Sequence, residues 1–315
     1  DSNAAKNGLE LSYDSILRGR DGISHSMKVR NKRVRIIDVE AENGHDLMTT
    51  IDVDIQDMAE KALVSKLKEP SVNGTLGMAI VMEVATGEVK AIVNMHRGKD
   101  GNYYEMKNSA ISDLMEPGST FKTLALMAAL DDGRADMTDS LEVWKNGWKY
   151  YGSTHKDAHP RDTVYSIRQS LAASSNIALA QIVTNGYEGS AKKFIRKLER
   201  MGLCDSVDYI IPGADQAQIL LPDDTVTISK MAYGYSVELS PLQMVMLYNS
   251  IANDGKLITP VLVSRVEKDG EVLEEYESKV LRNSICSNST LRDIRLCLHD
   301  VVWDNDLGTA SVYKW

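Results

Sequence analysis

Apolar positions along the chain follow two spacings, and each spacing predicts a different kind of element. From Thr50 to Lys68 apolar side chains recur every three or four positions, with aspartates at the start and Pro70 after the end, which predicts an amphipathic helix. Six later segments also have helical patterns: 120–130, 163–173, 177–183, 190–201, 225–232 and 241–252, and a last one covers 291–302. Continuous apolar runs at 77–84 with 88–93, and at 261–266 with 272–276, flank short turns and predict β-hairpins. Hairpins near both ends with helices between them favour an α+β fold.

Two segments do not follow these patterns. Residues 8–48 combine short β-branched runs with Gly and Asn turn signals, so we expect a small extended or hairpin segment that acts as a pedestal or linker. Residues 1–5 have the composition of a polar leader. Residues 131–162 are polar and aromatic with little periodicity, and we expect an irregular excursion. Its aromatic side chains either line a groove or pack locally, and base rates favour local packing.

Composition narrows the possible functions. The 315 residues are 43% apolar, enough for one large domain or two ordinary ones, and the net charge of −9 argues against nucleic acid as a partner. The three cysteines have no metal-type spacing. No run of about 18 apolar residues occurs, so the sequence contains no predicted membrane span.

The strongest candidate for chemistry is the stretch Glu116-Pro117-Gly118-Ser119-Thr120-Phe121-Lys122. Pro-Gly predicts a turn, and an apolar helix follows it, so Ser119 and Lys122, three positions apart, are expected on one face. A serine hydroxyl becomes a useful nucleophile when a neighbouring base takes its proton, and a lysine in apolar surroundings has the lowered pKa that this requires. The backbone N–H groups at the start of the helix point toward an oxyanion formed there.

The Ser-x-x-Lys spacing alone is weak evidence, because the chain contains it five times. The other pairs are Ser65/Lys68, Ser153/Lys156, Ser190/Lys193 and Ser311/Lys314. They lie at a helix end, in a polar loop, at an expected N-cap and near the chain end, whereas Ser119 alone opens an apolar helix after a turn.

A second candidate is Ser174-x-Asn176, between two predicted helices. A short polar turn there projects a hydroxyl and a carboxamide into a cleft, but Ser and Asn are also the usual helix caps, and capping is the commoner role. Both interpretations stay open at this point.

Other chemistries fit poorly. His155 and His159 are four positions apart, but Lys156 stands where a zinc protease needs Glu, and Pro160 ends any helix at once. No Gly-x-Ser-x-Gly elbow or Gly-rich phosphate loop is present. We therefore expect no metal and no organic cofactor.

With Ser119-x-x-Lys122 and Ser174-x-Asn176 placed, residues 9–315 resemble the class B penicillin-binding proteins, and most closely the division-specific branch. Further stretches similar to the family's landmarks are 48–56 (MTTIDVDIQ), 85–89 (ATGEV), 234–243 (GYSVELSPLQ), 253–256 (NDGK) and 308–310 (GTA). Together and in this order they are a strong signal.

The resemblance implies the penicillin-binding/β-lactamase-like fold, an antiparallel sheet flanked by helices, over residues 49–315, with residues 1–48 as the pedestal segment. It implies a D,D-transpeptidase in which Ser119 forms an acyl-enzyme, Lys122 is the base, Ser174 relays a proton and Asn176 orients the substrate amide. Stem peptides ending in D-Ala-D-Ala, β-lactams and divisome proteins including a glycosyltransferase are the implied partners. The implied location is the periplasmic face of the inner membrane, with an N-terminal helical anchor that this sequence does not include.

One family landmark is not found: a Lys-Thr-Gly motif on a strand beyond the Gly-Thr-Ala stretch does not occur before Trp315. We therefore expect a transpeptidase domain that is incomplete at its C-terminal end, with a recognisable but poorly acylated site. A β-lactam sensor or inactive scaffold, and a serine β-lactamase or carboxypeptidase, remain as alternatives, although the pedestal-like segment favours the cross-linking enzymes.

Overall fold

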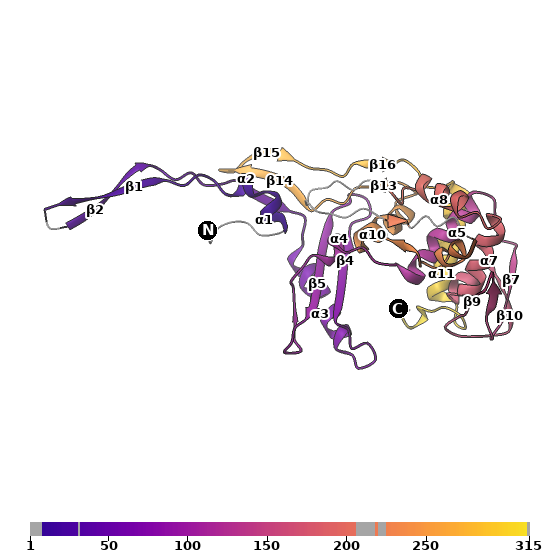
Figure 1. The fold of residues 1–315 in the computed structure, drawn as a ribbon. Helices are drawn as coiled ribbons and strands as arrows, with labels where there is room; N and C mark the ends of the chain where they lie inside the picture. The colour runs from indigo at the N-terminus through magenta and orange to yellow at the C-terminus, as the bar shows by residue number, and fades with distance from the viewer. Residues whose placement is uncertain (1–7, 31, 206–217, 220–224, 314–315) are drawn as a thin grey trace.

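A computed structural model describes residues 8–30, 32–205, 218–219 and 225–313 (Figure 1). The expected polar leader at residues 1–5, and Lys314 of the last Ser-x-x-Lys pair, lie outside the described residues.

The helices account for most of the right-hand body in Figure 1. They are α1 (Gly8–Ser12), α2 (Asp14–Leu17), α3 (Val53–Lys68), α4 (Ser109–Ser112), α5 (Lys122–Asp131), α6 (Ile167–Ala172), α7 (Asn176–Gly186), α8 (Ala191–Arg200), α9 (Thr225–Met231), α10 (Pro241–Ala252) and α11 (Asn288–Trp303), with 3-10 turns η1 (Gly118–Phe121) and η2 (Ser311–Tyr313). Within the described residues, none of these helices combines the length and apolar character needed to cross a membrane.

The strands form small antiparallel sheets. They are β1 (Ile23–Val29), β2 (Lys32–Val39), β3 (Asp46–Thr49), β4 (Leu76–Met82), β5 (Val89–Arg97), β6 (Tyr103–Tyr104), β7 (Ser140–Val143), β8 (Trp148–Tyr150), β9 (Ser153–His155), β10 (Thr163–Ser166), β11 (Gln218–Ile219), β12 (Val237–Glu238), β13 (Leu257–Ile258), β14 (Val263–Lys268), β15 (Glu271–Glu275) and β16 (Val280–Arg282). The described three-stranded sheets have the orders β4-β5-β6 and β15-β14-β3, and the remaining strands pair two by two. The expected α+β class is confirmed.

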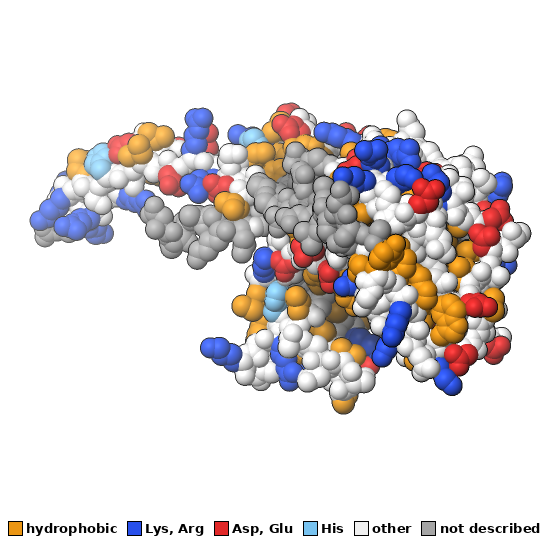
Figure 2. Space-filling view, turned by 45° about the vertical axis from the view of Figure 1, so that its right-hand side comes forward, with side chains coloured by type: hydrophobic (Ala, Val, Ile, Leu, Met, Phe, Trp, Pro, Cys, Tyr) orange, Lys and Arg blue, Asp and Glu red, His pale blue; other side chains and the backbone are white. Residues whose placement is uncertain are grey.

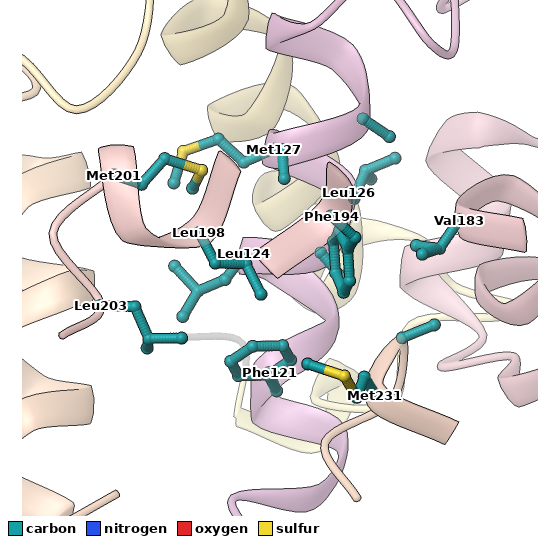
Figure 3. Close-up of a cluster of buried hydrophobic side chains, with 14 of the residues drawn as sticks. Phe121, Leu124, Leu126, Met127, Val183, Phe194, Leu198, Met201, Leu203 and Met231 are labelled. Atoms are coloured by element: carbon teal, nitrogen blue, oxygen red, sulfur yellow. The ribbon is translucent and has the colours of Figure 1, made fainter. Parts of the chain in front are cut away.

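The main core surrounds α5. Residues Lys122 to Ala129 of this helix are all buried, as expected for a helix that is apolar on every side. Side chains of α7, α8, α9 and the segment after α8 pack around it. Figure 3 labels members of this cluster from α5 and its neighbours: Phe121, Leu124, Leu126, Met127, Val183, Phe194, Leu198, Met201, Leu203 and Met231. Each fully buried Leu, Met or Phe contributes roughly 2 kcal/mol by removal from water, so the helix that follows Ser119 is anchored firmly.

A second layer consists of α3 on the β4–β5 hairpin. Asp52 caps α3 by accepting hydrogen bonds from the N–H groups of Asp54 and Ile55 at 3.0 and 3.1 Å. Leu67 of α3 packs against Val93 and Met95 of β5. The predicted helix and the predicted hairpin are thus both confirmed.

The β1–β2 hairpin extends away from the rest of the chain (Figure 1). Its side chains are exposed or half-buried, and Lys and Arg side chains gather at its end in Figure 2, where Lys28, Arg30, Lys32, Arg33 and Arg35 lie. At its base, the backbones of Arg20 and Glu42 exchange hydrogen bonds of 2.9 and 3.0 Å. β3 crosses the expected boundary at residue 48 and pairs with β14, and the division into residues 1–48 and 49–315 stays a prediction.

Two predictions of local structure are wrong. The expected helix over 163–173 begins only at Ile167, because Thr163–Ser166 forms β10 on β7 and Ser166 and Gln169 make a reciprocal capping box. Threonine, valine and tyrosine suit a strand, and the partner strand decided the outcome. The excursion at 131–162 is also more regular than expected, since it contains β7, β8 and β9.

Candidate active site

Ser119 lies on a tight turn at the start of the buried helix. Gly118 has φ +57°, and its N–H donates to the carbonyl of Gly234 at 3.1 Å. Ser119 is the second residue of the 3-10 turn η1, which leads directly into α5, and its side chain is exposed. The expected helix at 120–130 therefore begins with a tighter turn, which places an exposed hydroxyl above a fully buried segment.

Lys122 is the centre of the polar network beneath this hydroxyl. Its side chain is only 1% exposed. Nζ donates to Ser119 Oγ at 3.1 Å, to Ser174 Oγ at 2.9 Å and to the Ser174 carbonyl at 2.6 Å. An ammonium group has three donors, and these three acceptors account for all of them.

The protonation state of Lys122 is set by its surroundings. Burial among apolar side chains lowers the pKa of Lys122 from 10.5 to about 8, and the nearby carboxylate of Asp157 acts in the opposite direction. About a tenth of the amine is therefore neutral at pH 7, far more than for an ordinary lysine, and the neutral form is the one a general base requires.

Ser174 lies in the turn between α6 and α7 with φ +50°, a left-handed conformation that is uncommon for a residue with a Cβ. Its N–H donates to the Leu171 carbonyl at 2.9 Å, which closes the turn. The alternative that Ser174 caps the next helix is wrong, because Ser175 is the N-cap of α7 and accepts from the Ala178 N–H at 3.0 Å. The backbone geometry thus directs Ser174 Oγ to Lys122.

Asn176 is the first residue of α7, and its side chain is half-buried. Its Nδ2 donates to the Lys156 carbonyl at 2.8 Å. The structure therefore joins Ser119, Lys122 and Ser174 by hydrogen bonds, and it connects Asn176 to the segment that follows β9.

Sequence reasoning missed the role of Asp157. Its carboxylate accepts from Ser175 Oγ at 2.8 Å and from the Ile177 N–H at 3.0 Å, so it fixes the start of α7 beside Ser174. A carboxylate at a helix N-terminus is a favourable arrangement. In the sequence Asp157 is visible only as one polar residue of an aromatic-rich stretch, since its partners lie some twenty positions away.

The remaining candidates have other local roles. Ser190 caps α8, as expected, with its Oγ accepting from the Lys193 N–H at 3.4 Å. His155 is buried between Tyr233 and Ser229 rather than paired with His159. Within the part of the chain that the structure describes, no cluster of three His, Cys, Asp or Glu residues has metal-binding geometry. Trp148 and Tyr150 stack with ring centroids 4.9 Å apart, in agreement with local packing.

Comparisons with known proteins show the family and the fold of this chain. The family model of the penicillin binding protein transpeptidase domain matches residues 77–314. The probable peptidoglycan D,D-transpeptidase PbpC of Pseudomonas aeruginosa is 25% identical over 285 residues, which cover 87% of this chain. This chain spans only 49% of the length of that relative.

Two solved structures have the same fold. Penicillin binding protein 2X from Streptococcus thermophilus superposes with a TM-score of 0.83 at 21% identity, covering 97% of this chain and 46% of the other. Penicillin binding protein 3 from Mycobacterium tuberculosis, solved in complex with aztreonam, gives a TM-score of 0.77 at 25% identity, covering 98% of this chain and 66% of the other. The expected transpeptidase fold is confirmed. Because the family match covers more than half of its residues, the chain belongs to the penicillin-binding protein transpeptidase domain family.

Proposed function

We propose that this chain provides the catalytic part of a peptidoglycan D,D-transpeptidase that cross-links stem peptides through an acyl-enzyme on Ser119. The observation that carries the proposal is the position of Lys122 Nζ, 3.1 Å from Ser119 Oγ and 2.9 Å from Ser174 Oγ, in a site that lowers its pKa to about 8. One buried base thus contacts two hydroxyls, one to activate and one to relay the proton.

In the acylation step, Ser119 Oγ attacks the carbonyl carbon of the penultimate D-Ala while neutral Lys122 takes the hydroxyl proton. The backbone N–H of Ser119, the second residue of η1, stabilises the oxyanion. When the tetrahedral intermediate collapses, the bond to the terminal D-Ala breaks. Ser174 gives its proton to the leaving amine and receives one from Lys122, which returns the lysine to its neutral state.

In the second step, an amine of a neighbouring stem peptide attacks the ester carbonyl. Its proton returns through the same residues to Ser119, which leaves as a hydroxyl. An Asn side chain has two donor hydrogens and a carbonyl oxygen, and we assign those that do not bond the Lys156 carbonyl to orienting the substrate amide. A β-lactam enters as a substrate mimic, since its ring carbonyl replaces the peptide carbonyl.

The cellular setting follows from the resemblance. We place the domain in the periplasm, held at the inner membrane by a helix outside this sequence, where it contributes to septal wall synthesis with divisome partners that include a glycosyltransferase. The aztreonam complex of the structural relative supports β-lactam binding by this fold.

The decisive test is incubation of the protein that contains this chain with a fluorescent penicillin, followed by peptide mapping. We expect one stable adduct on Ser119 and none in Ser119→Ala. Ser153→Ala, which changes another Ser-x-x-Lys serine, is the matched control and should label normally. Labelling that survives Ser119→Ala would sink the proposal.

A further inference from the structure

A second buried polar network lies beside the Ser119–Lys122–Ser174 network and contributes nothing to the steps above. Its centre is His155 in β9, which is 1% exposed. His155 Nδ1 lies 2.7 Å from the Tyr233 hydroxyl, and Nε2 lies 3.2 Å from Ser229 Oγ. The chain thus buries a histidine with a polar partner at each ring nitrogen.

The hydrogen-bond partners fix the tautomer of this ring. Ser229 has a single hydroxyl proton and donates it to the Val226 carbonyl at 2.5 Å, so its Oγ can only accept from His155. Nε2 therefore carries the ring proton, and Nδ1 accepts the Tyr233 hydroxyl proton. Burial and the charge of Lys230 lower the pKa of His155, which keeps the ring in this neutral form at neutral pH.

The Tyr233 end of this network leads to the nucleophile. Tyr233 is followed by Gly234, whose carbonyl accepts from the Gly118 N–H at 3.1 Å. The two glycines are in such close contact that a Cβ on Gly234 would lie 2.0 Å from the Gly118 carbonyl oxygen. A displacement of Tyr233 is therefore transmitted to Gly118, the residue before Ser119.

The segment that carries His155 also leads to Ser174. Asp157, two residues after His155, holds the N-terminus of α7 through Ser175 Oγ and the Ile177 N–H. Residues 155–157 thus contact the start of α7 beside Ser174 through Asp157, and they connect to the turn that carries Ser119 indirectly, through the His155–Tyr233 hydrogen bond and Gly234.

We propose that His155 is a positioning residue: through Tyr233 and Gly234 it sets the place of Ser119 relative to Lys122 and Ser174. The inference rests on the proposed acylation of Ser119 and adds a residue that touches neither substrate nor base. Misplacement of reacting groups by about 1 Å can slow a reaction by roughly a hundredfold without weakening binding. A loss of this order in the limiting acylation rate is the expected effect of breaking the His155–Tyr233 bond.

Two substitutions distinguish the hydrogen bonds made by the two ring nitrogens of His155. In His155→Asn the carboxamide oxygen takes the place of Nδ1 and still accepts from Tyr233, whereas in His155→Gln the carboxamide reaches only the position of Nε2. With fluorescent penicillin, we expect His155→Gln and Tyr233→Phe each to lower the limiting acylation rate by about ten- to a hundredfold, with an unchanged dissociation constant of the initial complex. His155→Asn should stay within about threefold of the wild type. The double variant should be no slower than either single one, because both changes remove the same bond.

Tyr187→Phe is the matched control for lost stability. It removes another buried tyrosine hydroxyl, which donates to the Ala128 carbonyl at 3.0 Å at the far end of α5. We expect it to lower the unfolding temperature and leave acylation unchanged. Wild-type acylation in His155→Gln, or effects of His155→Gln and Tyr233→Phe that multiply in the double variant, would overturn the positioning role.

Amide hydrogen exchange of Gly118 tests the same role without acylation. Exchange at this N–H should accelerate in His155→Gln and Tyr233→Phe and should match the wild type in His155→Asn and Tyr187→Phe. If the wild-type protein forms no adduct on Ser119, the proposed function fails, and exchange at Gly118 decides the positioning role alone. Equal exchange rates in all variants would overturn it.

Discussion

The pKa of Lys122, lowered to about 8 by burial, makes acylation dependent on pH in the range of ordinary assays. Below about 8 the amine is mostly charged and cannot take the Ser119 proton, so we expect the acylation rate to fall about tenfold per pH unit. Above this pKa the rate should level off. Rapid-mixing measurements with a fluorescent penicillin between about pH 6 and 9 check the profile.

One variant completes this test. Lys122→Ala should slow acylation by orders of magnitude while the protein stays folded. A rate that does not change through the pKa of about 8, or a normal rate in Lys122→Ala, would mean that another group acts as the base.

Two substitutions of Ser174 distinguish the role of its hydroxyl from the role of its backbone conformation. Ser174→Ala and Ser174→Gly both remove the hydroxyl, but glycine adopts the φ of +50° without the cost of about 1 kcal/mol or more that alanine has. We expect both variants to lose roughly a hundredfold or more in acylation, with Ser174→Gly the more stable of the two in urea unfolding. Recovery of acylation in Ser174→Gly would show that the turn, and not the hydroxyl, matters.

At this scale local spacing and turn residues predicted that Ser119 and Lys122 meet, and the structure joins their side chains by a hydrogen bond. The sequence left Ser174 between a role in a cleft and a helix cap. It was not sufficient for Asp157 and His155, whose partners come from α7 and from the segment after α9. Only the tertiary contacts bring these residues to the site. The same limit explains the wrong capping role for Ser174, since its positive φ has no sequence signature in a serine.

Gly234 is the point where the segment after α9 meets the turn that carries Ser119. Gly234→Ala places a Cβ against the Gly118 carbonyl and adds the cost of φ +84°. We expect a loss of stability of more than about 2 kcal/mol and a slower acylation, since the turn must shift. Chemical unfolding and the penicillin rate measure the two effects.

Gly270 provides the matched control for that substitution. It has φ +85° in the turn between β14 and β15, and a Cβ there meets nothing within 4 Å. Gly270→Ala should therefore lower the free energy of unfolding only by the cost of placing a Cβ residue in the left-handed conformation, about 1 kcal/mol, and should leave acylation unchanged. Equal effects of the two substitutions would show that the glycine contact is unimportant.

Elements were predictable where the pattern and the caps agreed. The helix at 241–252 has the bounds expected, because Ser240 and Gln243 make a capping box and Pro241 occupies the first position. The strand β10 was not predictable, because its conformation depends on pairing with β7 some twenty residues earlier. Similarly, β3 pairs with β14 across more than two hundred residues, which no local pattern indicates.

At the scale of the whole molecule, the predicted division at residue 48 treats the projecting β1–β2 hairpin as a separable part. The backbones of Arg20 and Glu42 form a hydrogen-bonded pair at its base, so an Asn-Gly turn can replace residues 21–41 and close the chain there. The described side chains among those removed are exposed or half-buried, and we expect the free energy of unfolding to change by less than about 1 kcal/mol. The rate of penicillin acylation should stay the same.

Leu198→Ala provides the reference for a loss of stability, since removal of a core side chain that is 1% exposed should lower the free energy of unfolding by about 2–5 kcal/mol.

The hairpin end combines five Lys and Arg residues in a chain of net charge −9, a local charge suited to a partner with an acidic surface. The shortened protein should therefore acylate normally and yet fail to support division in cells, since the proposed divisome partners would lose this basic surface. Loss of folding on shortening would instead make the hairpin part of the catalytic domain, and normal division would remove the reason to assign it a partner.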